Sequence, residues 1–251
     1  SLTAAGKVNV NGSGATVDAS ALKDAFIVLN GTNEFAKKAD GTDSDHKYVA
    51  SVKVSGLTLT GMTNSLIKDA QKTLLEELIV DNSVIEMPAS NKNFIDFSGK
   101  GYVGLVKVTK STIWAKDKNT GFFAQYGSRP KNVDGNLLQQ FDVQNSTIVN
   151  IANGKNFCDL KQNGTAQNVY FIIDNIFAEC GKSGQVVVGF NKGQSSATPV
   201  WDVTGNEFIW NGECVSDAEI AKAGQKDGED ILKDCVCGDP GFKDAANGDF
   251  T

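Results

Sequence analysis

The chain has 251 residues, of which 40% are hydrophobic and 22% charged, with a formal net charge of −6. This composition is typical of a globular protein. The acidic balance, with Arg129 as the single arginine, argues against a nucleic-acid partner, because such proteins carry basic patches. No apolar run approaches the roughly 18 residues that a transmembrane helix requires, so no membrane-spanning segment is expected.

Seven segments along the chain share one pattern, in which two apolar residues alternate with polar ones, a bend residue follows, and the alternation resumes. The bends require a left-handed backbone, which glycine adopts freely and asparagine tolerates. The segments are VNVNGSGATV (8–17), VKVSGLTL (52–59), LIVDNSVI (78–85), VKVTKSTI (106–113), FDVQNSTI (141–148), FIIDNIFA (171–178) and WDVTGNEF (201–208). The predicted bend residues are Gly12, Gly56, Asn82, Lys110, Asn145, Asn175 and Gly205, and the first inward column is Val8, Val52, Leu78, Val106, Phe141, Phe171 and Trp201.

A second strand follows most of these units at a nearly constant distance. Strands joined by tight bends and repeating roughly every 30 residues predict a parallel β-solenoid. An antiparallel sandwich is the alternative, but it does not explain seven aligned copies of one bend. We therefore expect an all-β fold, a single parallel β-helix of about seven coils, in which stacked Asn amides bond to one another and Lys110 interrupts the stack. The second strands are AFIVLN (25–30), SLIKDA (65–70), NFIDFS (93–98), GFFAQY (121–126), NFCDLK (156–161) and QVVVGF (185–190).

The segment 216–233, SDAEIAKAGQKDGEDILK, is predicted to form a helix. Ser216 would cap it and Glu219 would complete a capping box. Such a helix would cover the C-terminal end of the solenoid, where open strand edges invite association. The expected organisation is one domain, with the β-helix over 1–215 and a capping helix and tail over 216–251.

The five cysteines leave several pairings open. Cys158 lies in an apolar run and is expected to be a buried free thiol. Cys214 could pair with Cys235 or Cys237 if the protein is exported, because disulfides persist in oxidising compartments. The role of Cys180 in any pairing is left open.

The repeated units and the ending DPGFKDAANGDF (239–250) resemble pectin-lyase-like, right-handed parallel β-helix proteins, and most of all the exported β-helix proteins of glycan-degrading gut bacteria, which are often surface lipoproteins. The resemblance covers nearly the whole chain. It implies three sheets, with substrate held on the first sheet, around 94–98, 122–126 and 157–161. It also implies a secreted or outer-surface location, with a processed N-terminus and a possible lipid anchor.

The resemblance suggests candidate site residues on and beside the first sheet. If the protein is a lyase, the candidate catalytic residues are Arg129, Lys131 and Lys161; the motifs of polygalacturonases are absent. Asp96 and Asp159 are expected to be about 10 Å apart with Ala124 between them, at the upper limit for a pair of glycosidase carboxylates. The expected substrate-binding residues are Asp96, Tyr126, Arg129, Asp159 and Lys161.

Two further groups are weaker candidates. Asp40, Asp43 and Asp45 could hold Ca²⁺, but their spacing misses the EF-hand pattern, which favours a solvated acidic loop; no other cofactor is expected. Trp114 and Trp210 could form exposed platforms for sugar rings, whereas a column of phenylalanines is assigned to the core: Phe26, Phe94, Phe122 and Phe157.

The principal expectation is a monomeric, non-catalytic protein that binds polysaccharide. A polysaccharide lyase or glycoside hydrolase acting on the first sheet, and a structural or adhesive surface protein, are the alternatives.

Overall fold

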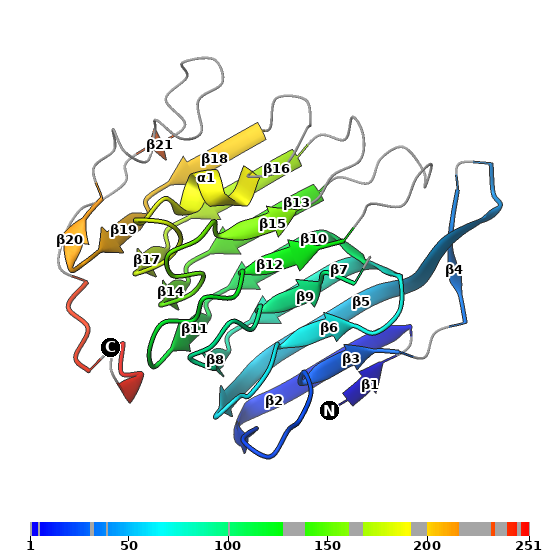
Figure 1. Ribbon diagram of the computed structural model, residues 1–251, viewed down its shortest axis with the longest axis horizontal. Helices are drawn as coiled ribbons and strands as arrows, with labels where there is room; N and C mark the ends of the chain where they lie inside the picture. The colour runs from blue at the N-terminus through cyan, green and yellow to red at the C-terminus, as the bar shows by residue number, and fades with distance from the viewer. Residues whose placement is uncertain are drawn as a thin grey trace.

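The computed structural model describes residues 2–4, 6–30, 33–38, 40–99, 101–127, 139–160, 168–191, 200–215, 232–233, 240–244 and 247–250. The described chain is almost entirely β, in two sheets of nearly all parallel strands (Figure 1). Six strands form sheet A and fifteen form sheet B. The elements are β1 (Leu2–Ala4), β2 (Lys7–Asp18), β3 (Ile27–Leu29), β4 (Phe35–Lys37), β5 (Asp43–Thr60), β6 (Ile67–Asp69), β7 (Thr73–Asp81), β8 (Val84–Met87), β9 (Ile95–Phe97), β10 (Tyr102–Thr109), β11 (Thr112–Ala115), β12 (Ala124–Tyr126), β13 (Gln139–Gln144), β14 (Thr147–Val149), β15 (Cys158–Leu160), β16 (Asn168–Ile173), β17 (Ile176–Ala178), α1 (Val186–Asn191), β18 (Val200–Thr204), β19 (Glu207–Trp210), β20 (Glu213–Cys214) and β21 (Leu232–Lys233).

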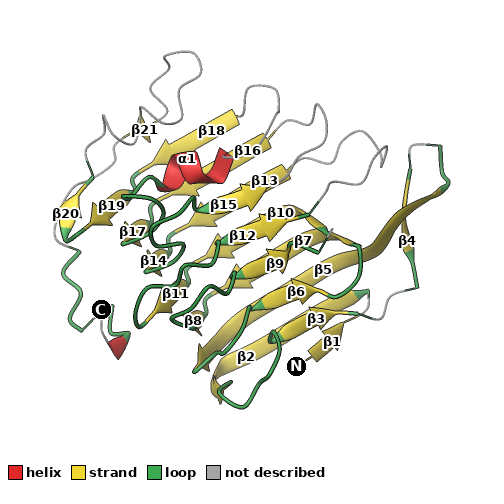
Figure 2. Cartoon of the chain, viewed as in Figure 1, coloured by secondary structure: helices red, strands yellow, loops and turns green. Residues whose placement is uncertain are grey.

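Successive segments of the chain stack as coils. β7, β8 and β9 are followed by β10, β11 and β12, each of which pairs in parallel with its counterpart one coil earlier. β13, β14 and β15 repeat the arrangement on the next coil. Figure 2 shows this order running from β1 and β2 at one end to β18 at the other. The repeated parallel stacking confirms the all-β prediction and is compatible with a parallel β-helix.

The bends within sheet B lie where the sequence predicts them, with two exceptions. In the first unit, Ser13 and Gly14 have positive φ values, and the predicted Gly12 does not. Asn82, Lys110 and Asn145 have φ values of 46°, 48° and 49°. In the next coil the positive φ belongs to Asp174, not to the predicted Asn175. The cause is register, because Phe141 pairs with Tyr170 rather than Phe171. Both alternating sets of residues in that strand are apolar, so the sequence pattern did not determine which set faces inward. The inward residues there are Tyr170 and Ile172.

The predicted stack of amides at the bend residues is wrong. The side chains of Asn82, Lys110 and Asn145 are exposed, so Lys110 interrupts nothing. A buried polar ladder forms instead at the position after each of the bends from Asn82 to Gly205. Its members are each at most 4% exposed: Ser83, Ser111, Ser146, Asn175 and Asn206.

Each member of this polar ladder accepts a hydrogen bond from the backbone of the coil before it. Ser83 N–H donates to Ser111 Oγ (3.1 Å), and Ser111 N–H donates to Ser146 Oγ (3.2 Å). Ser146 N–H donates to Asn175 Oδ1 (3.0 Å), and Asn175 N–H to Asn206 Oδ1 (3.0 Å). Buried backbone groups at these bends are thus satisfied by side chains where the strand ladder is interrupted.

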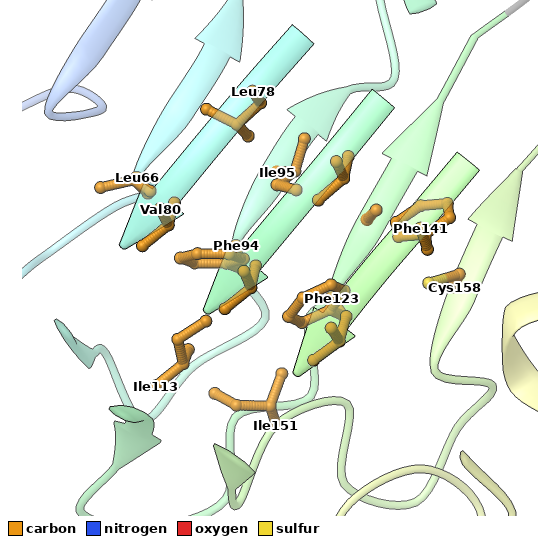
Figure 3. Packing of buried hydrophobic residues seen from close by; sticks show 14 of the residues in the cluster. Leu66, Leu78, Val80, Phe94, Ile95, Ile113, Phe123, Phe141, Ile151 and Cys158 are labelled. Carbon is orange, nitrogen blue, oxygen red and sulfur yellow. The ribbon is translucent and has the colours of Figure 1, made fainter. Parts of the chain in front are cut away.

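The core lies between the two sheets and is rich in aromatic side chains from the coil of Phe94 onward (Figure 3). The predicted phenylalanine column is present, with Phe123 in place of Phe122. The Phe123 ring lies 5.2 Å from that of Phe94 and stacks at 4.8 Å on that of Phe157. Two consecutive phenylalanines made this one-residue offset invisible to pattern alone. Gly121 indicates where the offset arises, because the backbone there passes very close to the preceding coil. A Cβ at this position would lie 2.0 Å from the Lys92 carbonyl oxygen.

The segment 185–190, predicted as a strand, forms helix α1. α1 packs against β15, the last strand of sheet A. Gly189 allows this close approach, because a Cβ at that position would lie 2.4 Å from the Phe157 nitrogen. Three consecutive valines favour a strand by propensity, but tertiary packing overrides that preference. The helix thereby covers an edge that would otherwise be open.

The C-terminal segment differs from its prediction where the structure describes it. Leu232 and Lys233, assigned to the end of a capping helix, form β21, which pairs in parallel with β18. The remainder of the predicted helix, 216–231, lies outside the described residues.

The tail residues 240–250, where described, pack on the outer face of the strands that follow the bends. The Phe250 ring meets the Trp114 ring edge-to-face at 5.7 Å. Gly248 permits this contact, since a Cβ would lie 2.6 Å from the Trp114 ring. Trp114 is consequently 6% exposed, so its prediction as an exposed platform is wrong. Trp210 is half-buried and packs against the core.

The prediction of a buried free thiol at Cys158 is confirmed, and the roles left open for Cys180 and Cys214 can now be assigned. Cys158 and Cys180 are free and buried, and Cys214 is disulfide-bonded. Its partner lies outside the described residues, where Cys235 and Cys237 are found. Burial raises the pKa of the Cys180 thiol to about 12 and that of Cys158 well above its usual value.

We therefore expect Cys158 and Cys180 to resist thiol reagents in the folded protein, because the reacting thiolate is disfavoured and inaccessible. Cys158→Ala and Cys180→Ala should each leave the native thiol titre unchanged and lower the titre in denaturant by one thiol. A fall in the native titre for either variant would contradict the buried placement.

Candidate functional site

The outer face of sheet A carries a row of polar side chains on adjacent coils. Strand pairing places Lys68 beside Asp96, Asp96 beside Gln125, and Gln125 beside Asp159. Their neighbours Ile67, Ile95, Ala124 and Cys158 are buried, and side chains alternate along a strand, so these four point outward. We call Lys68, Asp96, Gln125 and Asp159 the first-sheet row.

Hydrogen bonds hold the middle of the first-sheet row in place. Gln125 Nε2 donates to Asp159 Oδ2 at 2.9 Å, and Asn93 Nδ2 donates to Gln125 Oε1 at 2.9 Å. Asn93 is anchored in turn, because its Oδ1 accepts from the Phe122 backbone N–H at 2.8 Å. The row is therefore ordered before any ligand arrives.

Lys68, at one end of the row, and Asp96 beside it are each held by a residue outside the row. Lys68 Nζ forms an ion pair with Asp24 at 2.7 Å. Asp96 Oδ1 accepts from the Ser98 hydroxyl at 2.6 Å and from the Ser98 N–H at 3.2 Å. Asp96 and Asp159 thus each have a partner, and part of each carboxylate can still accept from other donors.

Lys155 and Phe122 flank the row beside Asp159. The Lys155 ammonium lies 4.1 Å from the centroid of the Phe122 ring, a cation–π distance. Partial burial lowers the pKa of Lys155, while Asp159 acts in the opposite direction. The arrangement sets a cation, an aromatic ring and a carboxylate next to one another at one end of sheet A.

The structure brings two of the predicted substrate-binding residues together. Asp96 and Asp159 occupy the same outward column, with Gln125 rather than Ala124 between them. Two strand spacings separate them by about 10 Å. That is wider than the ~5–5.5 Å of a retaining pair, and the Gln125 side chain fills the interval where an inverting enzyme holds water. The geometry suits binding better than acid–base catalysis by this pair.

Tyr126 does not belong to this face, so its prediction as a substrate-binding residue is wrong. It is 1% exposed and its ring contacts Phe97, Tyr102 and Phe141 inside the core. Burial raises its pKa well above the usual value. It is an inward residue because it lies one position beyond the outward Gln125. Arg129, Lys131 and Lys161 lie outside the described residues.

Sequence reasoning missed Asn93, Gln125 and Lys155. Gln125 could have been found from a correct register of 121–126, because it is the strand's outward residue. Asn93 begins the predicted strand 93–98 but precedes the observed strand β9, and Lys155 precedes the predicted strand 156–161. Only the fold shows that they reach the row.

The three acids proposed as a Ca²⁺ site each have a separate local partner. Asp40 accepts from Thr42, Asp43 pairs with Lys37, and Asp45 pairs with Lys72. The Lys72 ammonium lowers the pKa of Asp45 to about 2, with His46 contributing. Within the part of the chain that the structure describes, no three His, Cys, Asp or Glu side chains gather as a metal site would require.

In comparisons with known proteins, no family model matches the chain, and neither a curated protein nor a solved structure matches it. Across the described ranges, no helix has both the length and the apolar character that crossing a membrane requires.

Proposed function

We propose that this chain is a right-handed, pectin-lyase-like parallel β-helix, exported or held at the cell surface, that binds polysaccharide along the first-sheet row without cleaving it. The observation that carries the proposal is the row itself, with donors and acceptors repeated on adjacent coils and fixed by the Asn93–Gln125–Asp159 hydrogen bonds. A preordered row loses little side-chain entropy when it binds a chain of hydroxyl groups.

The disulfide at Cys214 supports the exported location, since such bonds are rare in reducing compartments. A row of side chains that runs across adjacent coils suits an extended polymer, whereas small molecules are generally bound in concave sites. The face carries both signs of charge, with Lys68 and Lys155 beside Asp24, Asp96 and Asp159, so the panel includes acidic as well as neutral glycans.

Retention on immobilised polysaccharides tests this proposal. We expect the wild-type chain to be retained by at least one glycan of a panel, and Gln125→Ala to weaken that binding about tenfold or more, because it removes one ligand-facing amide and releases two neighbours. Lys110→Ala, at an exposed bend of sheet B, is the matched control and should bind normally. Equal binding by both variants would place the glycan elsewhere, and retention by no glycan would favour a structural or adhesive role.

A polysaccharide lyase is the second candidate, because Lys155 combines a lowered pKa with a place beside Asp159. A lysine whose pKa is lowered can act as a general base. Incubation with uronate-containing glycans would then give unsaturated products that absorb in the ultraviolet, and Lys155→Met would abolish them while glycan retention persists. Absence of such products with retention intact favours the binding protein.

A further inference from the structure

Strand β2 leaves one end of the stack uncovered. Among the described residues, β2 pairs only with β5, and β1, at the same end, pairs only with β3 (Figure 1). Most of β2 is exposed, including Val17 at 36%, one of three large hydrophobic side chains exposed in the described chain. A strand edge of this length, with apolar residues exposed along it, is suited to pair with another strand.

The two halves of β2 are complementary to each other. β2 follows β5 around a corner, pairing first over Lys7–Asn11 and then over Ala15–Asp18. Val8 and Val10 pair with the inward residues Val52 and Val54, and Ala15 and Val17 pair with the inward residues Leu57 and Leu59. Lys7, Asn9, Thr16 and Asp18 therefore face outward.

We propose that a second copy of this chain covers this end, with β2 pairing antiparallel to β2 about a two-fold axis through the corner. Antiparallel pairing with the axis between Gly12 and Ser13 sets Lys7 opposite Asp18 and Val8 opposite Val17. It also sets Asn9 opposite Thr16 and Val10 opposite Ala15. Every pair joins residues of the same face, and each of the two end pairs joins opposite charges.

Symmetry makes this contact closed. A two-fold axis through the corner exchanges the two halves of β2, so each complementary pair occurs twice in one interface. Such an isologous contact stops at two copies, unlike a head-to-tail contact, which continues into filaments. The end row of half-buried Val8 and Val10 would be covered at the same time.

Charge reversal with rescue tests the dimer on the full chain. Sedimentation equilibrium should show a reversible dimer, and Lys7→Asp or Asp18→Lys alone should raise its dissociation constant about tenfold or more, because each creates two like-charge pairs. The double variant Lys7→Asp/Asp18→Lys should restore the dissociation constant to about the wild-type value. Lys110→Asp, equally exposed but away from β2, is the charge-matched control and should dimerise normally.

A second measurement tests the register of the proposed β2–β2 pairing by disulfide cross-linking. Asn9→Cys/Thr16→Cys should form a covalent dimer on mild oxidation that reductant reverses, because these positions oppose one another. Asn9→Cys/Asn145→Cys, with the second thiol at an exposed bend on another coil, should not. A chain that is monomeric throughout the concentration range, a dimer unaffected by both charge reversals, or an assembly that grows beyond two copies would overturn the proposal.

Discussion

Phe123→Ala is expected to lower the free energy of unfolding by about 3–5 kcal/mol, the usual range for deleting a buried aromatic ring. Phe123 is 0% exposed and its ring touches four others, those of Phe94, Phe141, Phe157 and Phe190. These rings come from different coils and from α1, so the cavity cannot close by moving one segment. Chemical denaturation followed by circular dichroism measures the loss.

Phe122→Ala is the matched control, because the same residue type is removed one position earlier. Phe122 is half-buried and its ring is covered by the Lys155 side chain. We expect a loss of about 1 kcal/mol or less, as for a partly exposed position. Equal losses in the two variants would contradict the register that assigns Phe123, and not Phe122, to the core.

Asn175→Ala is expected to cost about 2–4 kcal/mol, because it leaves a buried backbone donor without an acceptor. Asn175 Oδ1 accepts from Ser146 N–H, and its Nδ2 donates to Val143 O at 2.8 Å and to Asn206 Oδ1 at 2.9 Å. No solvent reaches the site to replace these bonds, since Asn175 is 1% exposed.

Two further variants distinguish the contribution of the polar ladder to stability from that of the bend residues. Asn175→Ser should lose about half as much, because serine serves the same role at Ser83, Ser111 and Ser146. Asn145→Gly, at an exposed bend with φ 49°, should change stability by about 1 kcal/mol or less. If Asn145→Gly proved more destabilising than Asn175→Ser, the bend residues would stabilise the stack more than the polar ladder does. That result would agree with the sequence prediction of an amide stack at the bends.

The sequence predicted the class of fold, the parallel stacking and most of the bends, because a repeated pattern averages over local ambiguity. It failed where apolar residues occupy both alternating positions of a strand, because the inward set cannot then be distinguished from the outward set. Apolar residues fill both faces of 170–173, and two phenylalanines stand side by side at 122–123. In each case the error was one residue, which moves every side chain of a strand to the opposite face.

The same offsets limited the prediction of the site. Asp96 and Asp159 were found because their strands are strictly alternating, whereas Gln125 and Tyr126 were exchanged by the error at 122–123. Asn93 and Lys155 depend on how corners fold, which residue spacing does not encode. The ladder of Ser83, Ser111 and Ser146 was visible as an aligned column, but its burial became evident only with the fold.

The folded-back tail has a consequence for cooperativity. In a stack of coils each unit contacts only its neighbours, so unfolding can start at an end and proceed coil by coil. Here the Phe250 ring in the tail packs edge-to-face against the ring of Trp114 on β11, near the middle of the stack. Phe242 and Phe250 pack against a cluster that runs from Trp114 through Val149 and Ala178 to Ile209. Because these contacts join the coil of β11 to the coils that follow it, the tail couples those coils and favours a single, all-or-none transition.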